Sequence, residues 1–360
     1  MAKLGEVCLL KAGKFVSAND ISPEYNKGLY PCFGGNGIRG YVADYTHDGE
    51  FPLIGRQGAL CGNVNLASGK FHATEHAVVV QPKIEMNVHW LYYALSAMNL
   101  GQYATGAAQP GLAVSKLETL SIEIPNISEQ NKIAQTLYKV EQLVNVRKQQ
   151  LAKLDELVKA RFVEMFENSL WPNTSLNDIC SEIVDCPHST PKYEGNLEHP
   201  AIRTTEIKKG YIDWDSMKYV SEEEYQKRIK SLKPVPGDIV YGREGTYGNA
   251  AIIPDGYEFC LGQRVMLFRP NKTKCISAYV LYAILSDHVK RQADEKNVGA
   301  TVPHVNVADA KQFDVVLPPL SIQNQFAAFV ERVDQQKQTV QQSLEKLELM
   351  KKALMQEYFG

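Results

Sequence analysis

The sequence predicts an α+β fold with two similar mixed α/β globular domains separated by a two-helix antiparallel coiled coil, as a pseudo-two-fold internal repeat. Two long helical runs, residues 128–166 and 321–359, have apolar residues in alternating steps of four and three. This heptad pattern is typical of helices that pack against a partner helix. Both runs share one register, because Ile133 of the first recurs as Phe326 of the second, 193 residues later.

The heptad seam is expected to pair the two helices. Each helix is about 57 Å long at 1.5 Å per residue. Antiparallel pairing places one globular domain at each end, although register alone does not exclude parallel pairing. The expected seam residues are all aliphatic: Leu137, Val144, Leu151, Leu154, Val158, Val330, Val340, Leu344, Leu347 and Leu354.

Four basic residues interrupt the seam: Arg147, Arg161, Lys337 and Lys351. Two interpretations remain open. Their aliphatic stems can cover the seam while the charges reach water, or the charges can face a partner protein.

The repeat divides the chain into a first globular domain (1–125), a first long helix (126–168), a second globular domain (169–318) and a second long helix (319–360). Within the first domain, strands are expected at 51–54, 77–80 and 119–124, and a helix at 88–98. Ser128 is the expected N-cap of the first long helix.

Short motifs recur in the same order in both globular domains. Gly55-Arg56-Gln57-Gly58 matches Gly242-Arg243-Glu244-Gly245, and a Gly-Asn pair follows each of them. Residues 192–233, in contrast, have no counterpart of similar size in the first domain. A repeated framework with different loops indicates that the loops select a ligand.

Composition limits the class of protein. The chain is 44% hydrophobic and 22% charged, which is typical of a soluble globular protein, and we expect it in the cytoplasm. No apolar run approaches the ~20 residues needed to cross a bilayer. The seven cysteines include no Cys-x-x-Cys pair, which favours reduced thiols over disulfides or a zinc site. A net charge of −2 argues against non-specific binding of polyanions, so any nucleic-acid contact must depend on local patches or on a basic partner.

Motifs for catalysis, cofactors and metals are not evident. Gly35-x-Gly37-x-x-Gly40 matches the dinucleotide fingerprint in letters, but no helical pattern follows it. His72 and His76 are four residues apart, beside a strand-like run and without the His-Glu-x-x-His pattern. We therefore expect a chain that is not an enzyme and that holds no metal or cofactor of its own.

The remaining chemistry is that of binding. Arginine pairs well with guanine, glutamine with adenine, and glutamate accepts a hydrogen bond from cytosine. A single basic residue is more often a solvated surface residue, but the recurrence of the Gly-Arg loops favours a DNA-binding role for them. The candidate DNA-binding residues are Asn36, Arg39, Arg56, Gln57, Gln109, Lys192, Arg203, Lys208, Arg243, Glu244, Tyr247 and His304.

The chain resembles the specificity (S) subunit of type I restriction-modification enzymes over nearly its whole length. The resemblance depends on the run from Gly34 to Tyr41, the paired Gly-Arg loops, the heptad helices, and the Pro-x-x-Ser-x-Gln-Asn entries at Pro125 and Pro318. It implies two target-recognition domains that each read half of a bipartite site in double-stranded DNA. It also implies that the helices dock two methyltransferase subunits, and that restriction/translocase subunits complete the complex. S-adenosylmethionine, ATP and Mg would then belong to these partners.

If paired helices hold the two domains apart, the DNA site should contain a gap of fixed length. The main alternative is a duplicated coiled-coil adaptor whose globular domains bind protein or glycan ligands. A fragment of a fused restriction-methylation polypeptide and a free-standing repressor are weaker alternatives. Binding to a duplex that weakens with salt would favour the DNA-binding interpretation, because phosphate contacts release counterions.

Overall fold

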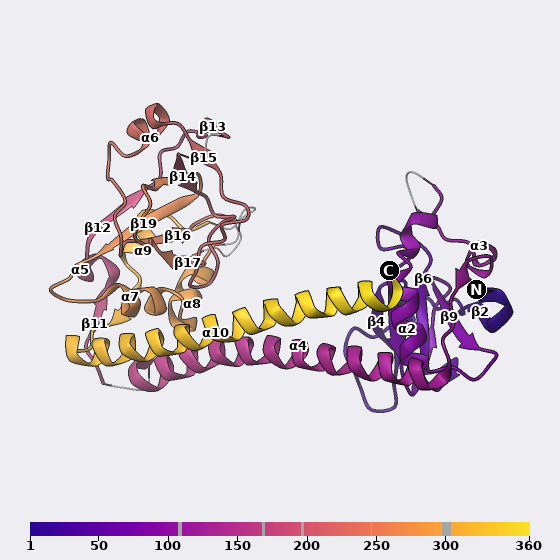
Figure 1. The fold of residues 1–360 in the computed structure, drawn as a ribbon. Coiled ribbons are helices and arrows are strands. Elements are labelled where there is room, and N and C mark those ends of the chain that lie inside the picture. The colour runs from indigo at the N-terminus through magenta and orange to yellow at the C-terminus, as the bar shows by residue number, and fades with distance from the viewer. Residues whose placement is uncertain (107–109, 168–169, 196–197, 246, 297–303) are drawn as a thin grey trace. The chain divides into compact units, whose positions relative to one another are not determined.

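The computed structural model describes residues 1–360 except 107–109, 168–169, 196–197, 246 and 297–303 (Figure 1). The chain forms two compact units, which are described separately below. Unit 1 contains Met1–Gln149 and Gln341–Gly360, and unit 2 contains Gln150–Val340. The long helices, α4 (Ile127–Phe162) and α10 (Leu320–Phe359), each contribute one part to each unit. None of the helices in the described ranges is long and apolar enough to cross a membrane.

Unit 1 contains two four-stranded sheets. The first is antiparallel, in the order β2-β9-β6-β7, and the second has the order β4-β3-β8-β5 with β3 and β8 parallel. The strands are β2 (Cys8–Ala12), β3 (Tyr30–Gly34), β4 (Gly37–Val42), β5 (His47–Asp48), β6 (Phe51–Gly55), β7 (Val64–Ala67), β8 (Lys70–Ala73) and β9 (Ala77–Pro82).

Unit 2 repeats this plan. Its first sheet has the order β12-β19-β16-β17 and is again antiparallel, and its second has the order β13-β15-β14-β18 with β14 and β18 parallel. The strands are β12 (Cys180–Asp185), β13 (Tyr193–Glu194), β14 (His199–Ile202), β15 (Tyr219–Val220), β16 (Ile239–Gly242), β17 (Ala250–Ile252), β18 (Cys260–Leu261) and β19 (Val265–Pro270).

The segment 192–233 has more of a counterpart than its sequence indicated. Its strands β14 and β15 take the sheet positions that β3 and β4 take in unit 1. The additions of unit 2 here are the strand β13 and the helix α6 (Glu222–Arg228).

Short elements complete each unit. In each, a two-residue or three-residue strand near the start of the globular part pairs antiparallel with the strand that precedes a long helix. These strands are β1 (Ala2–Lys3), β10 (Ser121–Ile122), β11 (Asn173–Ser175) and β20 (Asp314–Val316); the shorter helices are α1 (Leu4–Val7), α2 (Val88–Ala97), α3 (Val114–Glu118), α5 (Leu176–Ile179), α7 (Ser277–Ile284), α8 (Asp287–Lys296) and α9 (Val307–Lys311). The 3-10 turns are Ala18–Asp20 and Leu100–Tyr103, and a π-helical turn, Val163–Glu167, follows α4.

Two local predictions need correction. α4 starts one residue before Ser128, and its first turn is capped by Asn126, whose Oδ1 accepts a hydrogen bond from Glu129 N at 3.0 Å. The strand expected over 119–124 is limited to Ser121–Ile122, and Thr119 is instead the C-cap of the helix α3.

A buried glutamine connects each long helix to its globular part. Gln130 Oε1 accepts a hydrogen bond from Asn87 N, at the start of α2, and its Nε2 donates to Pro125 O. Gln323, 193 residues later, repeats this with Ile276 N, at the start of α7, and with Pro318 O. Each glutamine therefore satisfies backbone groups at a helix end that otherwise lack partners.

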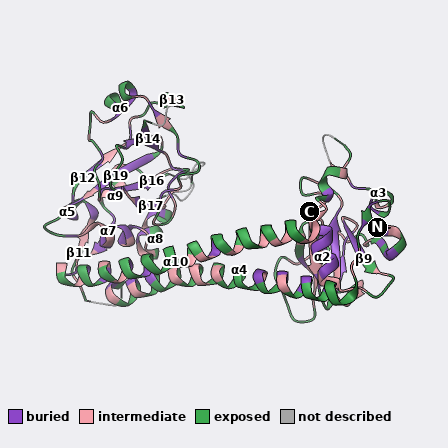
Figure 2. Ribbon diagram, viewed as in Figure 1, coloured by how far each residue is buried: buried purple, intermediate pink, exposed green. Residues whose placement is uncertain are grey.

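The long helices pair antiparallel within each unit, as predicted. In unit 1, Lys351 lies 2.8 Å from Glu141 and Lys148 lies 2.9 Å from Glu348, so higher residue numbers on α4 meet lower ones on α10. In unit 2, Asp155 pairs with Lys337 and the ring of Phe162 contacts that of Phe326, so the helices are antiparallel there as well. The ten expected seam residues are all buried or half-buried, and Figure 2 shows buried and intermediate residues along both long helices.

The basic residues of the seam pair within the chain. Lys337 lies 2.5 Å from Asp155, and Lys351 contacts Glu141. Arg147 Nε donates to Ser343 Oγ at 3.1 Å, and Arg161 pairs with Glu164. These contacts favour the first of the two interpretations, in which the aliphatic stems cover the seam. The charged ends pair with polar or acidic side chains of the same chain at the edge of the seam.

The core of each unit combines sheet, helix and seam. In unit 1, Ile133 and Leu137 of α4 pack in the same cluster as Ile54, Val78 and Trp90, and Leu354 and Phe359 of α10 lie against it. In unit 2, Phe326 and Val330 of α10 join an equivalent cluster with Ile239, Phe268 and Tyr279. The heptad pattern therefore continues directly into the globular cores.

Candidate nucleic-acid interface

The two Gly-Arg loops are held by the same backbone hydrogen bonds. Arg56 N donates to His76 O at 3.0 Å, and Arg56 O accepts from Leu112 N at 2.9 Å. Arg243 N donates to Arg264 O at 2.9 Å, and Arg243 O accepts from Val305 N at 2.8 Å. Leu112 and Val305 are themselves 193 residues apart, so the framework belongs to the internal repeat.

The neighbouring residues extend this framework. Gln57 forms a β-bridge with Gly111, and Glu244 forms one with His304, the residue 193 positions after Gly111. The Gly-Asn pairs form equivalent hydrogen bonds in both units. Asn63 O accepts from Gly55 N at the end of β6, and Asn249 O accepts from Gly242 N at the end of β16, each at 2.8 Å. Two equivalent frames therefore present different side chains.

In unit 1 the frame lies against the β3–β4 turn. A Cβ atom at Gly55 would lie 2.0 Å from Gly35 O, so only glycine allows this approach. Asn63 Nδ2 donates to Oδ1 of the exposed Asn36 at 2.8 Å. The structure thus brings Asn36 close to the loop of Arg56 and Gln57.

The unit 1 side chains differ in exposure. Gln57 and Arg39 are exposed, and Arg56 is half-buried, with a buried Nε that has no hydrogen-bond partner among the described residues. Gln109, the remaining candidate of this unit, lies outside the described residues.

In unit 2 the corresponding arginine is mostly covered. The Arg243 side chain is 12% exposed, and its Nε lies 3.2 Å from Asp185 Oδ1. Glu244 lies between two arginines, with Oε1 3.8 Å from Arg243 Nη2 and Oε2 3.1 Å from Arg264 Nε. The exposed cation of this loop region is therefore Arg264, which the sequence analysis did not select.

The other candidates of unit 2 lie in different settings. His304 is exposed beside Glu244. Tyr247 donates a hydrogen bond to Asp294 Oδ1 at 2.5 Å, which raises the pKa of the phenol, so that Tyr247 remains neutral at physiological pH.

Among the basic candidates Lys192, Arg203 and Lys208, Lys192 is exposed, whereas Arg203 and Lys208 have acidic partners. Arg203 Nε donates to Glu206 Oε2 at 3.0 Å, and Glu206 is fully buried. Lys208 lies 3.4 Å from Asp213 Oδ2.

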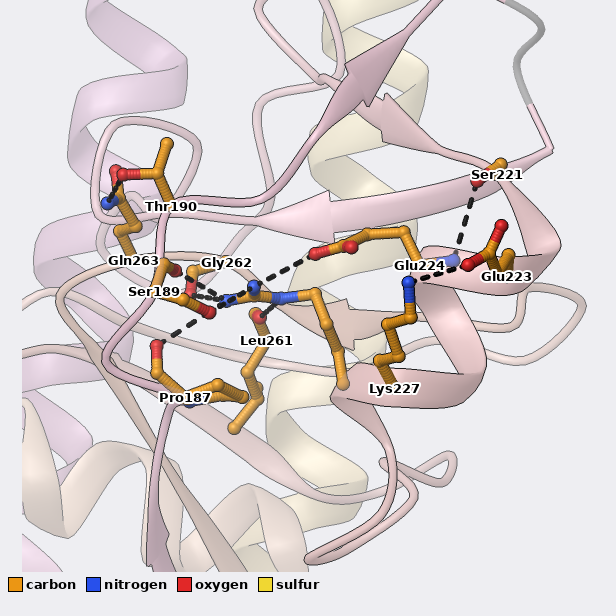
Figure 3. Close-up of polar contacts among 11 residues, drawn as sticks. Pro187, Ser189, Thr190, Ser221, Glu223, Glu224, Lys227, Leu261, Gly262 and Gln263 are labelled. Carbon is orange, nitrogen blue, oxygen red and sulfur yellow. Dashed lines mark hydrogen bonds and ion pairs between the residues drawn. The ribbon is translucent and has the colours of Figure 1, made fainter.

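A buried arginine that the sequence analysis missed fixes the loop after β12 (Figure 3). Arg228 is 4% exposed, and its guanidinium donates to Leu261 O and Gly262 O, both at 2.8 Å, and to Ser189 O at 3.2 Å. Gln263 Nε2 donates to Thr190 Oγ1 in the same loop at 2.7 Å. These hydrogen bonds hold the loop in place. Within it, the His188 side chain is 76% exposed, and its Nε2 lies 3.5 Å from Asp185 Oδ2. Two prolines that flank a polar triplet, Pro187 and Pro191, are the only sequence signal for this loop.

Comparison with known proteins gives the class to which this arrangement belongs. A family model described as "Type I restriction modification DNA specificity domain" matches residues 1–156 and 169–349. The chain therefore belongs to the family of type I restriction-modification DNA specificity domains. Specificity subunits are non-catalytic DNA-recognition subunits, which agrees with the expectation that this chain is not an enzyme.

Individual relatives carry the same description. The EcoprrI specificity subunit of Escherichia coli is 53% identical over 143 residues, which are 39% of this chain and 36% of that protein. A putative type I restriction enzyme specificity subunit of Haemophilus influenzae is 24% identical over 319 residues, 85% of this chain and 80% of that one. The match thus spans about a third of the first relative's length and most of the second's.

Solved structures share the fold. The S subunit of a type I restriction-modification system from M. genitalium superposes with a TM-score of 0.63 at 17% identity, over 99% of this chain and 95% of that one. A chain from a study of complex assembly and conformational transition of the type I R-M system superposes with a TM-score of 0.59, over 99% and 96%. Both likenesses support the α+β architecture with its internal repeat.

Proposed function

We propose that this chain recognises a bipartite, gapped sequence in double-stranded DNA, with one half-site bound by each unit. The observation that carries the proposal is the repeated frame around Arg56 and Arg243, which has the same hydrogen bonds in both units and different side chains at its surface. A repeated frame suits the repeated backbone of a duplex, and different side chains suit two different half-sites.

The same proposal assigns the chain's partners. The long helices dock two methyltransferase subunits, and restriction/translocase subunits join the complex through them. S-adenosylmethionine, ATP and Mg act in those subunits, none of them in this chain, and the complex works in the cytoplasm where the DNA lies. Membership of the specificity family supports this assignment.

Methylome sequencing of a host with and without this chain tests the proposal. We expect a gapped motif containing methyladenine that is present only when the chain is produced together with its methyltransferase. An identical methylome in both strains would contradict the proposal.

A binding titration separates DNA recognition from the adaptor alternative. On a duplex that contains the mapped motif, the logarithm of the affinity should fall linearly with the logarithm of the salt concentration, because phosphate contacts release counterions. An affinity for the duplex that does not depend on salt argues for the adaptor.

A further inference from the structure

Four charged side chains and one histidine of unit 2 contact one another in a row. The row runs His188, Asp185, Arg243, Glu244, Arg264, with nitrogen–oxygen distances of 3.5, 3.2, 3.8 and 3.1 Å between successive members. The middle three are 12–27% exposed, whereas His188 and Arg264 at the ends are 76% and 66% exposed. The inner members therefore lie between two exposed side chains, His188 at one end and the cation Arg264 at the other.

The backbone of Arg264 is fixed in an unusual conformation. Its φ is +61°. In the described part of the chain, Asn99 is the only other non-glycine residue with a positive φ. Its carbonyl accepts two hydrogen bonds, from Thr204 Oγ1 at 2.7 Å and from Arg243 N at 2.9 Å, which hold this conformation in place. Glycine would adopt it without strain, so an arginine here indicates a use for its side chain.

Glu244 also forms an ion pair with the Arg264 guanidinium, 3.1 Å from Nε. The carboxylate contacts Nε, and among the described residues no hydrogen bond or ion pair occupies Nη1 or Nη2. Two parallel N–H donors on an exposed guanidinium match the O6 and N7 acceptors of guanine in the major groove. Because the backbone of Arg264 is already held by two hydrogen bonds, less conformational freedom is lost on binding.

We propose that Arg264, paired with Glu244 at its Nε, reads a guanine in the half-site of unit 2; this inference rests on the DNA recognition proposed above. Arg243, whose side chain is mostly covered, is then a positioning residue that holds Glu244 and Asp185. In unit 1 the equivalent positions are His76 and Gln57, so the two half-sites are read by different chemistry.

The test is a selection from a library of randomised duplexes, carried out with the full chain in complex with its methyltransferase subunits. Four forms are compared: wild type, Arg264→Gly, Glu244→Gln, and the control Lys272→Ala, which removes one exposed positive charge from unit 2 away from the row. Arg264→Gly suits φ +61°, so its melting temperature should not fall, and this checks that the fold is kept.

We expect Arg264→Gly to lose the preference for guanine at one position of one half-site, by about 5- to 150-fold, while all other positions are kept. Glu244→Gln should weaken the preference at the same position, and Lys272→Ala should leave the selected word unchanged.

Two results would overturn the assignment of Arg264. One is an unchanged word in Arg264→Gly. The other is equal weakening on all sequences with a salt slope reduced by about one, which would identify a phosphate contact instead. A wild-type complex that selects no word at all would refute the proposed function as well, so the two failures can be told apart.

Discussion

At the scale of single residues, the buried polar side chains determine how the candidate interface of unit 2 is built. Arg228 is covered, yet its guanidinium has carbonyl partners on two segments that are far apart in sequence, around residues 187–189 and 261–262. Burial of a charge is tolerated only when such partners are complete. Arg228 therefore connects the loop of His188 with the strand end that precedes Arg264.

Replacement of Arg228 by alanine should destabilise unit 2 by about 3–5 kcal/mol. Glu224, whose Oε1 lies 3.3 Å from Arg228 Nη1, would lose its buried partner. Four carbonyl groups would lose theirs as well, those of Pro187, Ser189, Leu261 and Gly262. Lys227 is a matched control one position earlier in α6. It makes an exposed pair with Glu223, and Lys227→Ala should cost less than about 1 kcal/mol. Denaturant unfolding of both variants measures the difference, and equal costs would mean that Arg228 is not a structural anchor.

The sequence predicted the positions of some binding candidates correctly and missed the surroundings of others. The Gly-Arg loops were found because they recur, and the structure gives both the same backbone contacts. Arg264 was missed because nothing in the sequence shows a positive φ at a non-glycine residue. Arg203 and Arg243 were selected as DNA-binding candidates, but their acidic partners Glu206 and Asp185 depend on the fold, which residue type does not reveal.

At the scale of elements, periodicity was the most informative signal. It predicted both long helices to within a few residues, and also the helix α2, because a heptad or 3.6-residue pattern is a local property. The second sheet of each unit was not predicted. Its strands are short and its parallel pairs, β3–β8 and β14–β18, join residues about forty to sixty positions apart.

The buried glutamine at the start of α10 gives a prediction for this scale. Gln323→Ala should destabilise unit 2 by about 1–3 kcal/mol, because Ile276 N, Lys274 O and Pro318 O lose their partner. Gln325→Ala, on the exposed side of the same turn, is the control and should change stability by less than about 0.5 kcal/mol.

Amide hydrogen exchange supplies a second measurement for Gln323→Ala. The exchange of the Ile276 amide should become faster in this variant and remain unchanged in the control. An unchanged Ile276 amide would show that Gln323 is not what holds the start of α7.

At the scale of the whole molecule, the proposed gapped site makes the long helices a determinant of target choice. Deleting residues 144–150 of α4 together with 342–348 of α10 removes one heptad from each helix, including the pair Lys148–Glu348. This shortens each helix by about 10 Å, or roughly three base pairs of DNA at 3.4 Å each.

Methylome sequencing of the double deletion should therefore show the same two half-sites with a gap that is about three base pairs shorter. Deletion from α4 alone puts the seam out of register and should abolish methylation. If the double deletion left the length of the gap unchanged, the length of the helices would not determine the spacing of the half-sites.

The composition of unit 1 also affects how the chain is made. Its core includes Leu137 of α4 and is covered by Leu354 and Phe359, yet all of unit 2 lies between these segments in the chain. At the usual pace of translation, 5–20 residues per second, ribosomes need roughly 10–40 s to synthesise that intervening stretch. During this time the apolar face of α4 is not yet covered by α10, because α10 has not been synthesised. A chaperone or another subunit of the complex can therefore bind this face first.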